Sequence, residues 1–253
     1  MRLMYNNFVD YAATVITAAT AAADLPVSNV QHPHRGKVYR TGTSGASEYV
    51  RFDLGGVQAV QAVILLDHTL TSGDSSIRLQ GGAAPGATTV NEAMTFHAGT
   101  MALFLSVPTA AYQYWQVVFT KSAAGETRDI GRIFLGTLVE CTKSFQHGSP
   151  EITPVDLSET DRSLGGQTFS DIKASYDEIK GEFYWIAAAQ GTALKTLADT
   201  VGTHTPFFLS VDPTNKPYDL LYYGKFSKLS AHKIEMAGSA YRWSVGFEMN
   251  EEV

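Results

Sequence analysis

Two histidines, His32 and His34, have the spacing that most directly suggests metal chemistry. On an extended chain, side chains at positions i and i+2 project to the same side, so both imidazoles could ligate one ion. Pro33 stands between them and the cationic Arg35 follows, and both features weaken a metal site. A solvated loop is the simpler interpretation, and we expect no bound metal and no cofactor.

The carboxylates form no pair with evident acid–base chemistry. Asp53 precedes a predicted turn, where an Asp side chain commonly accepts a backbone hydrogen bond. Asp156, Glu159 and Asp161 lie in a polar segment and are expected to be solvated. A glycosidase needs two carboxylates held across a cleft. The sequence also lacks the P-loop, GxGxxG, HExxH and G-x-S-x-G motifs, so we predict no catalytic residue and no enzyme activity.

A group of aromatic residues has two interpretations. Tyr112, Tyr114 and Trp115 stand close together in a strongly β-forming segment. They could form a platform on which a sugar ring stacks. A tryptophan in such a dense segment is more often part of the core, and we favour that role for Trp115.

Two polar loops, residues 31–37 and 69–75, form the candidate binding surface. In a β-sandwich they would lie near one end, and ligands commonly bind at loop ends of such folds. The candidate residues for contact with a glycan or a partner protein are His32, His34, Arg35, Thr69, Ser72 and Asp74.

The composition is that of an ordinary globular protein. The 253 residues are 44% hydrophobic and 17% charged, with a net charge of −6. There is no basic run of five residues and no apolar run of 18, so we predict neither nucleic acid nor a membrane as a partner. The alanine-rich stretch 15–25 is too short to span a bilayer and is interpreted as mature protein.

Cys141 is the single cysteine, which excludes an intrachain disulfide and a cysteine-rich zinc site. A small buried hydrophobic residue is its simplest role. The count also agrees with assembly in a reducing cytoplasm.

The stretch 49–68 is the central β signal of the chain. Val50, Phe52 and Leu54 alternate with polar residues, which predicts a strand with one buried face. Gly55-Gly56 then predicts a tight turn, because glycine adopts positive φ freely. Residues 60–66 are apolar throughout and predict a second strand that is buried on both faces.

The rest of the first half also favours short strands separated by turns. Further strands are predicted over 13–17, 37–41, 76–80, 101–107, 112–119 and 130–135. Many short strands with no convincing helix predict an antiparallel β-sandwich over residues 1–137.

The second half adds one helix to a β-rich pattern. Residues 188–201 place Leu194, Leu197, Ala198 and Val201 at i, i+3, i+4 and i+7, an apolar stripe that should pack on a sheet. Gly202 is a plausible C-cap. Segment 145–154 is predicted to be a connector, and strands are predicted over 172–185, 206–211, 220–226 and 241–249. We therefore predict a mainly β chain, with a second, β-barrel-like α+β domain over 138–253.

Residues 21–136 resemble the discoidin or galactose-binding-like jelly roll. The segments that carry this resemblance are Pro26–Val30, Val38–Thr41, Tyr49–Gly55, Val60–Leu66, Tyr114–Val117 and Ile130–Gly136. Tyr39 stands where the family commonly has tryptophan, and the usual disulfide of the family is absent. A secreted lectin or adhesion protein is therefore not expected.

Residues 138–253 look like the β-barrel domain of bacteriophage distal tail or baseplate hub proteins. The segments that carry this second resemblance are Gly165-Gly166, Ala188–Val201, Thr205–Phe208, Asp212-Pro213, Tyr222–Phe226 and Trp243–Glu252. Such tail proteins often carry a carbohydrate-binding-like domain beside a ring-forming barrel.

Together, the two resemblances imply a structural protein of a phage tail tip. It would form a homo-oligomeric ring, contact other tail proteins, and belong to a virion assembled in the host cytoplasm. The alternative is a carbohydrate-binding module that recognises host-surface glycans. The two hypotheses differ in whether side chains of loops 31–37 and 69–75 line one exposed pocket.

Overall fold

The computed structural model describes residues 1–105, 111–141, 150–216, 218–228, 232–237 and 240–252. The predicted fold class is confirmed: these residues form antiparallel strands and one α-helix. The backbone divides into two compact units. The sandwich unit comprises Met4–Leu138 and Pro217–Asp219, and the hairpin unit comprises Met1–Leu3, Val139–Lys216 and Leu220–Val253. Independent domains with a boundary at 137–138 stay a prediction.

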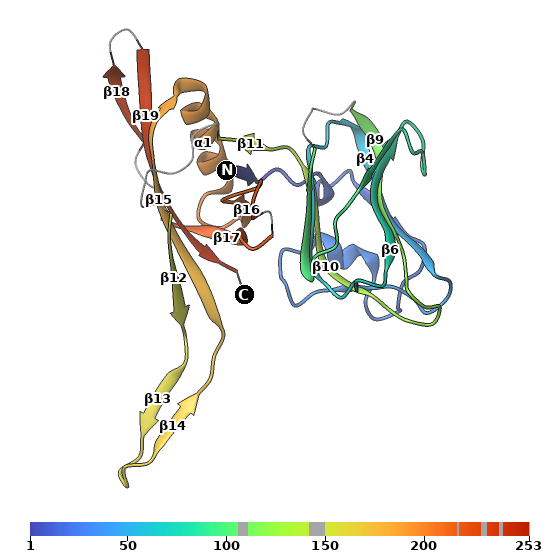
Figure 1. Cartoon of the computed structure of the whole chain (residues 1–253), viewed down its shortest axis with the longest axis horizontal. Coiled ribbons are helices and arrows are strands. Elements are labelled where there is room, and N and C mark those ends of the chain that lie inside the picture. Colours follow the sequence, from blue (N-terminus) through green and yellow to red (C-terminus); the bar gives the residue numbers. More distant parts are fainter. Residues whose placement is uncertain (106–110, 142–149, 217, 229–231, 238–239, 253) are drawn as a thin grey trace. The chain divides into compact units, whose positions relative to one another are not determined.

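The sandwich unit consists of two antiparallel sheets (Figure 1). The five-stranded sheet has the order β2 (Val15–Ala18), β4 (Ser47–Gln58), β9 (Tyr112–Thr120), β6 (Ser75–Gly82) and β7 (Val90–Ala93). The four-stranded sheet has the order β3 (Tyr39–Arg40), β10 (Asp129–Gly136), β5 (Ala62–His68) and β8 (Gly99–Phe104). Two short 3-10 helices, η1 (Phe8–Asp10) and η2 (Val27–Gln31), complete the unit.

The core of the sandwich unit follows the predicted alternation. Val50, Phe52 and Leu54 of β4 are buried, and Phe52 lies opposite the buried Trp115 of β9. Residues 62–66 of β5 are all buried, as predicted for a strand covered on both faces. The period of two thus sends one row of side chains from each strand into a shared core.

Gly55 was expected to end the strand at a turn, and this prediction was wrong. Strand β4 continues to Gln58, with a shift in its register against β9 between Asp53 and Gln58. Gly55 has a φ of +68°, and its N–H donates to Oδ1 of Asp53 at 3.0 Å. Gly55 therefore uses its positive φ to form a bulge within the strand, and the chain does not reverse direction there.

The close approach of Gly81 in β6 to Trp115 shows how tightly this core is packed. A Cβ atom at Gly81 would lie 2.6 Å from Cε3 of Trp115, inside the indole ring's contact distance. We expect Gly81→Ala to lower the free energy of unfolding by about 1–3 kcal/mol, since the core cannot accept the added methyl group without shifting. Urea denaturation checks this. An equal stability of Gly81→Ala and wild type would contradict the tight approach, and Gly56→Ala, with open space around its Cβ position, is the matched control.

The hairpin unit is built on a separate, eight-stranded sheet. Its order is β11 (Val139–Glu140), β1 (Arg2–Met4), β16 (Phe207–Ser210), β17 (Leu221–Lys228), β19 (Ala240–Glu251), β15 (Ser175–Ala187) and β12 (Glu151–Asp156), and β18 (His232–Ala237) pairs with β19. Strand β12 overlaps the end of segment 145–154, which was predicted to be a connector, and residues 145–149 of that segment lie outside the described part. Pro154 fits in β12 because this strand forms an edge of the sheet.

Helix α1 (Ala188–Val201) confirms the predicted helix and its buried stripe. Leu194, Leu197 and Val201 are buried where the helix packs on β15 and β19. Gly191 lies on this buried side, where a Cβ atom would come within 2.3 Å of Cγ of Trp243. Gly202 caps the helix, and its N–H donates to the carbonyl of Ala198 at 3.0 Å.

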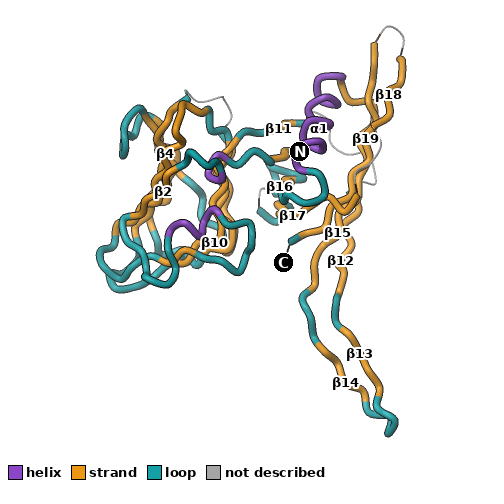
Figure 2. The backbone as a smooth tube through the Cα atoms, turned by 180° about the vertical axis from the view of Figure 1, so that it is seen from behind, coloured by secondary structure: helices purple, strands orange, loops and turns teal. Residues whose placement is uncertain are grey.

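A long two-stranded hairpin gives this unit its name. Strands β13 (Glu159–Arg162) and β14 (Thr168–Asp171) pair only with each other, and they continue the direction of β12 and β15 (Figures 1 and 2). Their residues are exposed, as are Leu164 at the tip and Ile172 beside β14. Among the described residues, no helix has the length and apolar character that crossing a membrane requires.

Candidate functional site

The two predicted loops are tied together at one end of β5. The guanidinium group of Arg35 forms a two-point contact with Asp67, with Nη2–Oδ1 and Nε–Oδ2 distances of 2.6 and 2.8 Å. Asp67 stands two residues before Thr69. This ion pair therefore holds loop 31–37 beside the start of loop 69–75.

The histidine pair of loop 31–37 is exposed and locally bonded. The ring centroids of His32 and His34 are 6.3 Å apart, and the backbone N–H of His34 donates to Nδ1 of His32 at 3.1 Å. Within the described part of the chain, no group of three or more His, Cys, Asp or Glu residues is placed to hold a metal ion.

Asp74 lies inside the fold rather than on the loop surface. Its carboxylate is fully buried and accepts hydrogen bonds from Arg128 at 2.7 and 2.9 Å and from the N–H groups of Thr71 and Ser122. Burial alone would raise the pKa of Asp74, but these hydrogen bonds outweigh it and lower the pKa to about 2. The side chain is thus fully used in fixing loop 69–75.

Thr69 and Ser72, the other two candidates of loop 69–75, differ in their contacts. Oγ1 of Thr69 accepts a hydrogen bond from the N–H of Asp129 at 2.8 Å, whereas Ser72 is exposed. Ligand contact by the five candidates other than Asp74 stays a prediction.

A second surface is formed by the outward side chains of the five-stranded sheet, which we call the outer face. Strand register places these side chains in three rows that cross the sheet. The rows are Val15–Asp53–Tyr114–Gly82, Thr17–Arg51–Gln116–Gln80–Asn91 and Tyr49–Val118–Arg78–Ala93. Most of this face is polar, in contrast to the buried face of the same strands.

The middle row is a chain of hydrogen-bonded side chains, the amide ladder, formed by Gln116, Gln80 and Asn91. Nε of Arg51 donates to Oε1 of Gln116 at 3.0 Å, and Nε2 of Gln116 donates to Oε1 of Gln80 at 2.7 Å. Nε2 of Gln80 and Nε of Arg78 both donate to Oδ1 of Asn91, at 3.1 and 2.6 Å. Because an arginine donates at each end, the orientation of every amide is fixed.

Arg51 is held in place by contacts of its Nε atom and its ring-facing side, and no hydrogen bond to its terminal nitrogens is present among the described residues. Its guanidinium carbon lies 4.4 Å from the ring centroid of Tyr49, a cation–π geometry. Loop 83–89 approaches closely at Gly86, where an added Cβ atom would lie 3.2 Å from Nη2 of Arg51. The position of the guanidinium group is therefore defined by strand β9, by Tyr49 and by this loop.

A pocket of about 270 Å³ lies on the outer face beside Arg51. It is lined by Val15, Thr17, Arg51, Asp53, Pro85 and Tyr114. Oδ1 of Asp53 already accepts hydrogen bonds from Gly55 and from Nε2 of Gln113, at 3.0 and 2.7 Å. The pocket thus combines one cation, one carboxylate, the hydroxyl groups of Thr17 and Tyr114, and an apolar wall. It contains no residue of loops 31–37 or 69–75.

Trp115, Tyr112 and Tyr114, which are close together in sequence, have different surroundings in the structure. Trp115 is 1% exposed and belongs to the core, as we favoured. Tyr112 is half-buried and packs against that core. Tyr114 alone of the three lines the outer pocket. Arg51 and Asp53 were not predicted as site residues, although their alternation with Val50, Phe52 and Leu54 already marked a polar face.

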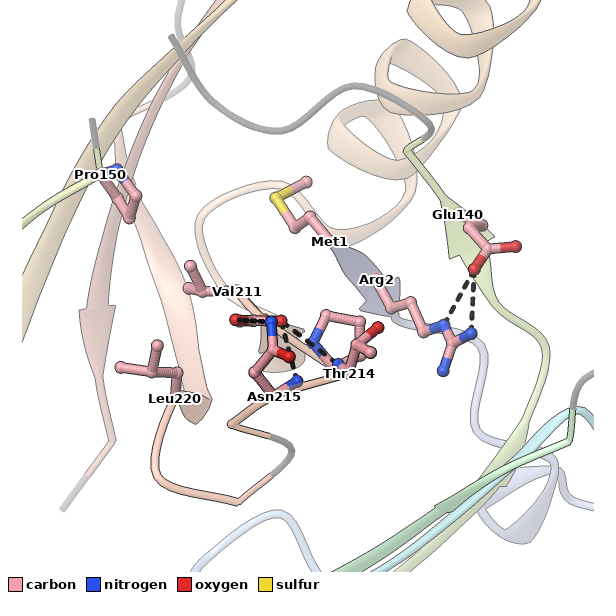
Figure 3. A pocket seen from close by; sticks show the side chains of 10 residues that line it. Met1, Arg2, Glu140, Pro150, Val211, Thr214, Asn215 and Leu220 are labelled. Carbon is pink, nitrogen blue, oxygen red and sulfur yellow. Dashed lines mark hydrogen bonds and ion pairs between the residues drawn. The ribbon is translucent and has the colours of Figure 1, made fainter. Parts of the chain in front are cut away.

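The hairpin unit has a separate pocket of about 530 Å³ (Figure 3). On one side Arg2 and Glu140 form an ion pair at 3.0 Å, and on the other Asp212 accepts hydrogen bonds from Thr214 and Asn215. Figure 3 shows two separate groups of contacts, so the charges on each side of this pocket already have partners. The outer pocket of the sandwich unit is the better candidate site, because among the described residues no hydrogen bond uses the terminal nitrogens of Arg51.

Comparisons with known proteins identify a fold and not a family. No protein-family model and no curated protein sequence matches the chain. Solved structures that resemble about half of the chain include a fucose binding module of Streptococcus pneumoniae, at 12% identity and a TM-score of 0.42 over 52% of this chain and 95% of that one. Chitosan-binding module 1 from the chitosanase/glucanase of Paenibacillus sp. IK-5 has 14% identity and a TM-score of 0.43, over 53% and 100%. A Clostridium perfringens module in complex with GalNAc-β-1,3-galactose has 9% identity and a TM-score of 0.41, over 52% and 100%.

The predicted role in a phage tail tip is contradicted by these comparisons. The matching structures named above are carbohydrate-binding modules, and they include no tail or baseplate protein. The jelly-roll part of the expected resemblance is confirmed. The virion role, the ring and the contacts with other tail proteins find no support. The resemblance of 138–253 rested on short, separate segments, which many β-rich domains can share.

Proposed function

We propose that the sandwich unit is a non-catalytic carbohydrate-binding module, and that it binds sugar on the outer face of its five-stranded sheet. One observation carries the proposal: Arg51, Asp53 and Tyr114 converge from two strands on a single pocket. The proposal rests on these side chains and not on the identity of similar folds.

The chemistry of the pocket suits a sugar ring. A sugar presents hydroxyl groups that both donate and accept hydrogen bonds, together with an apolar ring face. Arg51 supplies donors, Asp53 supplies an acceptor, and Tyr114 and Pro85 supply apolar surface. Pockets that combine apolar walls with a few converging polar groups are the usual form of a small-molecule site.

The rigidity of the outer face favours binding further. Arg51 is fixed through Gln116 and Tyr49, and Asp53 is fixed through Gly55 and Gln113. Side chains that are ordered before binding lose little conformational entropy when a ligand arrives. A sheet face also carries its polar groups on strands, which position them better than loops do.

Substitution of Tyr114 tests the location of the site. We expect Tyr114→Ala to weaken binding by about 5- to 10-fold or more, because truncating a central aromatic contact typically costs above 1 kcal/mol. The measurement is a glycan array that carries neutral and acidic oligosaccharides, followed by calorimetric titration of the oligosaccharide that binds best.

Two further variants make this test specific. Tyr184→Ala removes an exposed tyrosine of the hairpin unit and should leave the affinity unchanged. His34→Ala removes a candidate contact of loop 31–37. Loss of binding in His34→Ala with normal binding in Tyr114→Ala would move the site to the loops. Absence of any binding on the array would contradict a carbohydrate-binding role.

A further inference from the structure

We propose that the outer face selects acidic sugars, with Arg51 as the residue that binds the carboxylate of a uronic-acid unit. This inference rests on the proposed function, since it names the substrate class of the same pocket.

The sandwich unit contains six arginines, and four of them are bound to carboxylates. The pairs are Arg35–Asp67, Arg40–Asp129, Arg128–Asp74 and Arg132–Asp10. The other two, Arg51 and Arg78, have no carboxylate within ion-pair distance in the described residues. Both lie on the outer face. The two arginines of the unit that lack a carboxylate partner in the described residues therefore lie on the same face as the pocket.

The geometry of Arg51 fits a carboxylate in particular. Its Nε donates to Gln116, and among the described residues no hydrogen bond uses Nη1 or Nη2, although loop 83–89 approaches Nη2 at Gly86. The planar fork of these two nitrogens matches the two oxygens of a carboxylate and forms two parallel hydrogen bonds with them. Tyr49 lies against the guanidinium group and fixes the plane of the fork.

The remainder of the outer face is also richer in donors than in acceptors. Oδ1 of Asn91 accepts two hydrogen bonds, and the amide oxygens of Gln116 and Gln80 accept one each. Since each NH₂ group has two hydrogen atoms, more donor than acceptor positions remain on the ladder among the described residues. Arg78 adds a second cation two strands away from Arg51. An extended acidic oligosaccharide that crosses the strands would meet donors along its length.

The carboxylate of Asp53 limits where the acidic group can bind. Asp53 lines the same pocket and would repel a carboxylate placed next to it. It suits a ring hydroxyl group, while the carboxylate lies toward Arg51 and the amide ladder. The pocket thus recognises the orientation of the sugar as well as its charge.

The test compares tetragalacturonate with its methyl ester, which has the same rings without the charges. For the wild-type full chain we expect the acid to bind about 10- to 100-fold more tightly than the ester, and this preference to shrink as salt is added. Arg51→Gln should remove the preference, and Arg51→Lys should retain only part of it because lysine lacks the fork.

A matched control variant loses the same single positive charge as Arg51→Gln, but far from the pocket in sequence. Lys195→Gln removes one positive charge from the exposed face of α1 and should leave the preference intact. If acid and ester bind equally and Tyr114→Ala weakens both, acidic selectivity is overturned while carbohydrate binding stands. If neither compound nor any array glycan binds, both proposals are overturned. A preference that persists in Arg51→Gln would also overturn the role of this arginine.

Discussion

Lys121→Met is expected to destabilise the sandwich unit by about 3–5 kcal/mol, the largest effect of any substitution that we predict. Nζ of Lys121 and Oε1 of Glu48 are 3.0 Å apart, and both side chains are fully buried. Removing the lysine leaves an ionised carboxylate in the interior without its cation. The free energy of unfolding from urea denaturation at pH 7 measures the loss.

The surrounding hydrogen bonds explain why the pair acts as a unit. Nζ of Lys121 also donates to the carbonyl of Gly42 at 2.9 Å, and Oγ1 of Thr20 donates to the carboxylate of Glu48 at 2.8 Å. The hydroxyl group of Tyr39 donates to the carbonyl of Thr20 at 2.6 Å. These contacts connect the segment before β3, strand β4 and the end of β9.

A double variant separates loss of charge balance from loss of packing. In Glu48→Gln with Lys121→Met, no buried charge remains and Thr20 keeps an acceptor, so most of the stability should return. Lys195→Met, at an exposed pair with Asp199, should cost less than about 0.5 kcal/mol. A double variant as unstable as Lys121→Met alone would contradict an electrostatic origin.

Protonation linked to His68 should lower the free energy of unfolding of the sandwich unit by about 3 kcal/mol as the pH falls from 6.5 to 4. The imidazole is 5% exposed, and desolvation outweighs the opposing backbone contact with His97. Burial lowers the pKa of His68 from 6.5 to about 4. The folded protein therefore keeps the ring neutral while the unfolded chain takes up a proton.

The direction in which stability changes with pH follows from the number of protons that each state binds. Between the two pKa values the unfolded state binds more protons than the folded state, so stability falls as the pH falls through this range. Above pH 6.5 both states are neutral, and the effect vanishes. Below pH 4 both states carry the proton, and the loss is complete.

Unfolding of His68→Leu at pH 7 and at pH 4.5 checks this expectation. We expect His68→Leu to lose much less stability than wild type between these two values, because leucine does not titrate. His204→Leu, at an exposed histidine of the hairpin unit, should keep the wild-type dependence. An unchanged slope in His68→Leu would show that other groups cause the acid sensitivity.

Local patterns explain why part of the fold was predictable. The alternation at Val50, Phe52 and Leu54 and the helical stripe from Leu194 to Val201 depend on neighbours in sequence, and both are present in the structure. Gly55 was misinterpreted because a glycine with positive φ serves a turn and a bulge equally well.

The candidate site was harder to predict because it depends on strand register. Arg51, Gln80 and Gln116 come from three strands, and they form one row only after β4, β9 and β6 pair. Asp74 looked like a loop contact, since its partner Arg128 is 54 positions away in sequence. Distant partners of this kind leave no local signal, whereas the polar alternation around Arg51 did mark the correct face.

The exposed hairpin β13–β14 has a consequence for how the protein behaves in concentrated solution. A two-stranded ribbon has two open edges, and each can hydrogen bond to the ribbon of another molecule. Phe169, Leu164 and Ile172 add apolar surface to the same segment. Charged side chains of the ribbon, such as Asp161 and Arg162, oppose such pairing. Where copies do associate in concentrated solution, the contact should begin at the open edges of this hairpin and not in the sandwich unit.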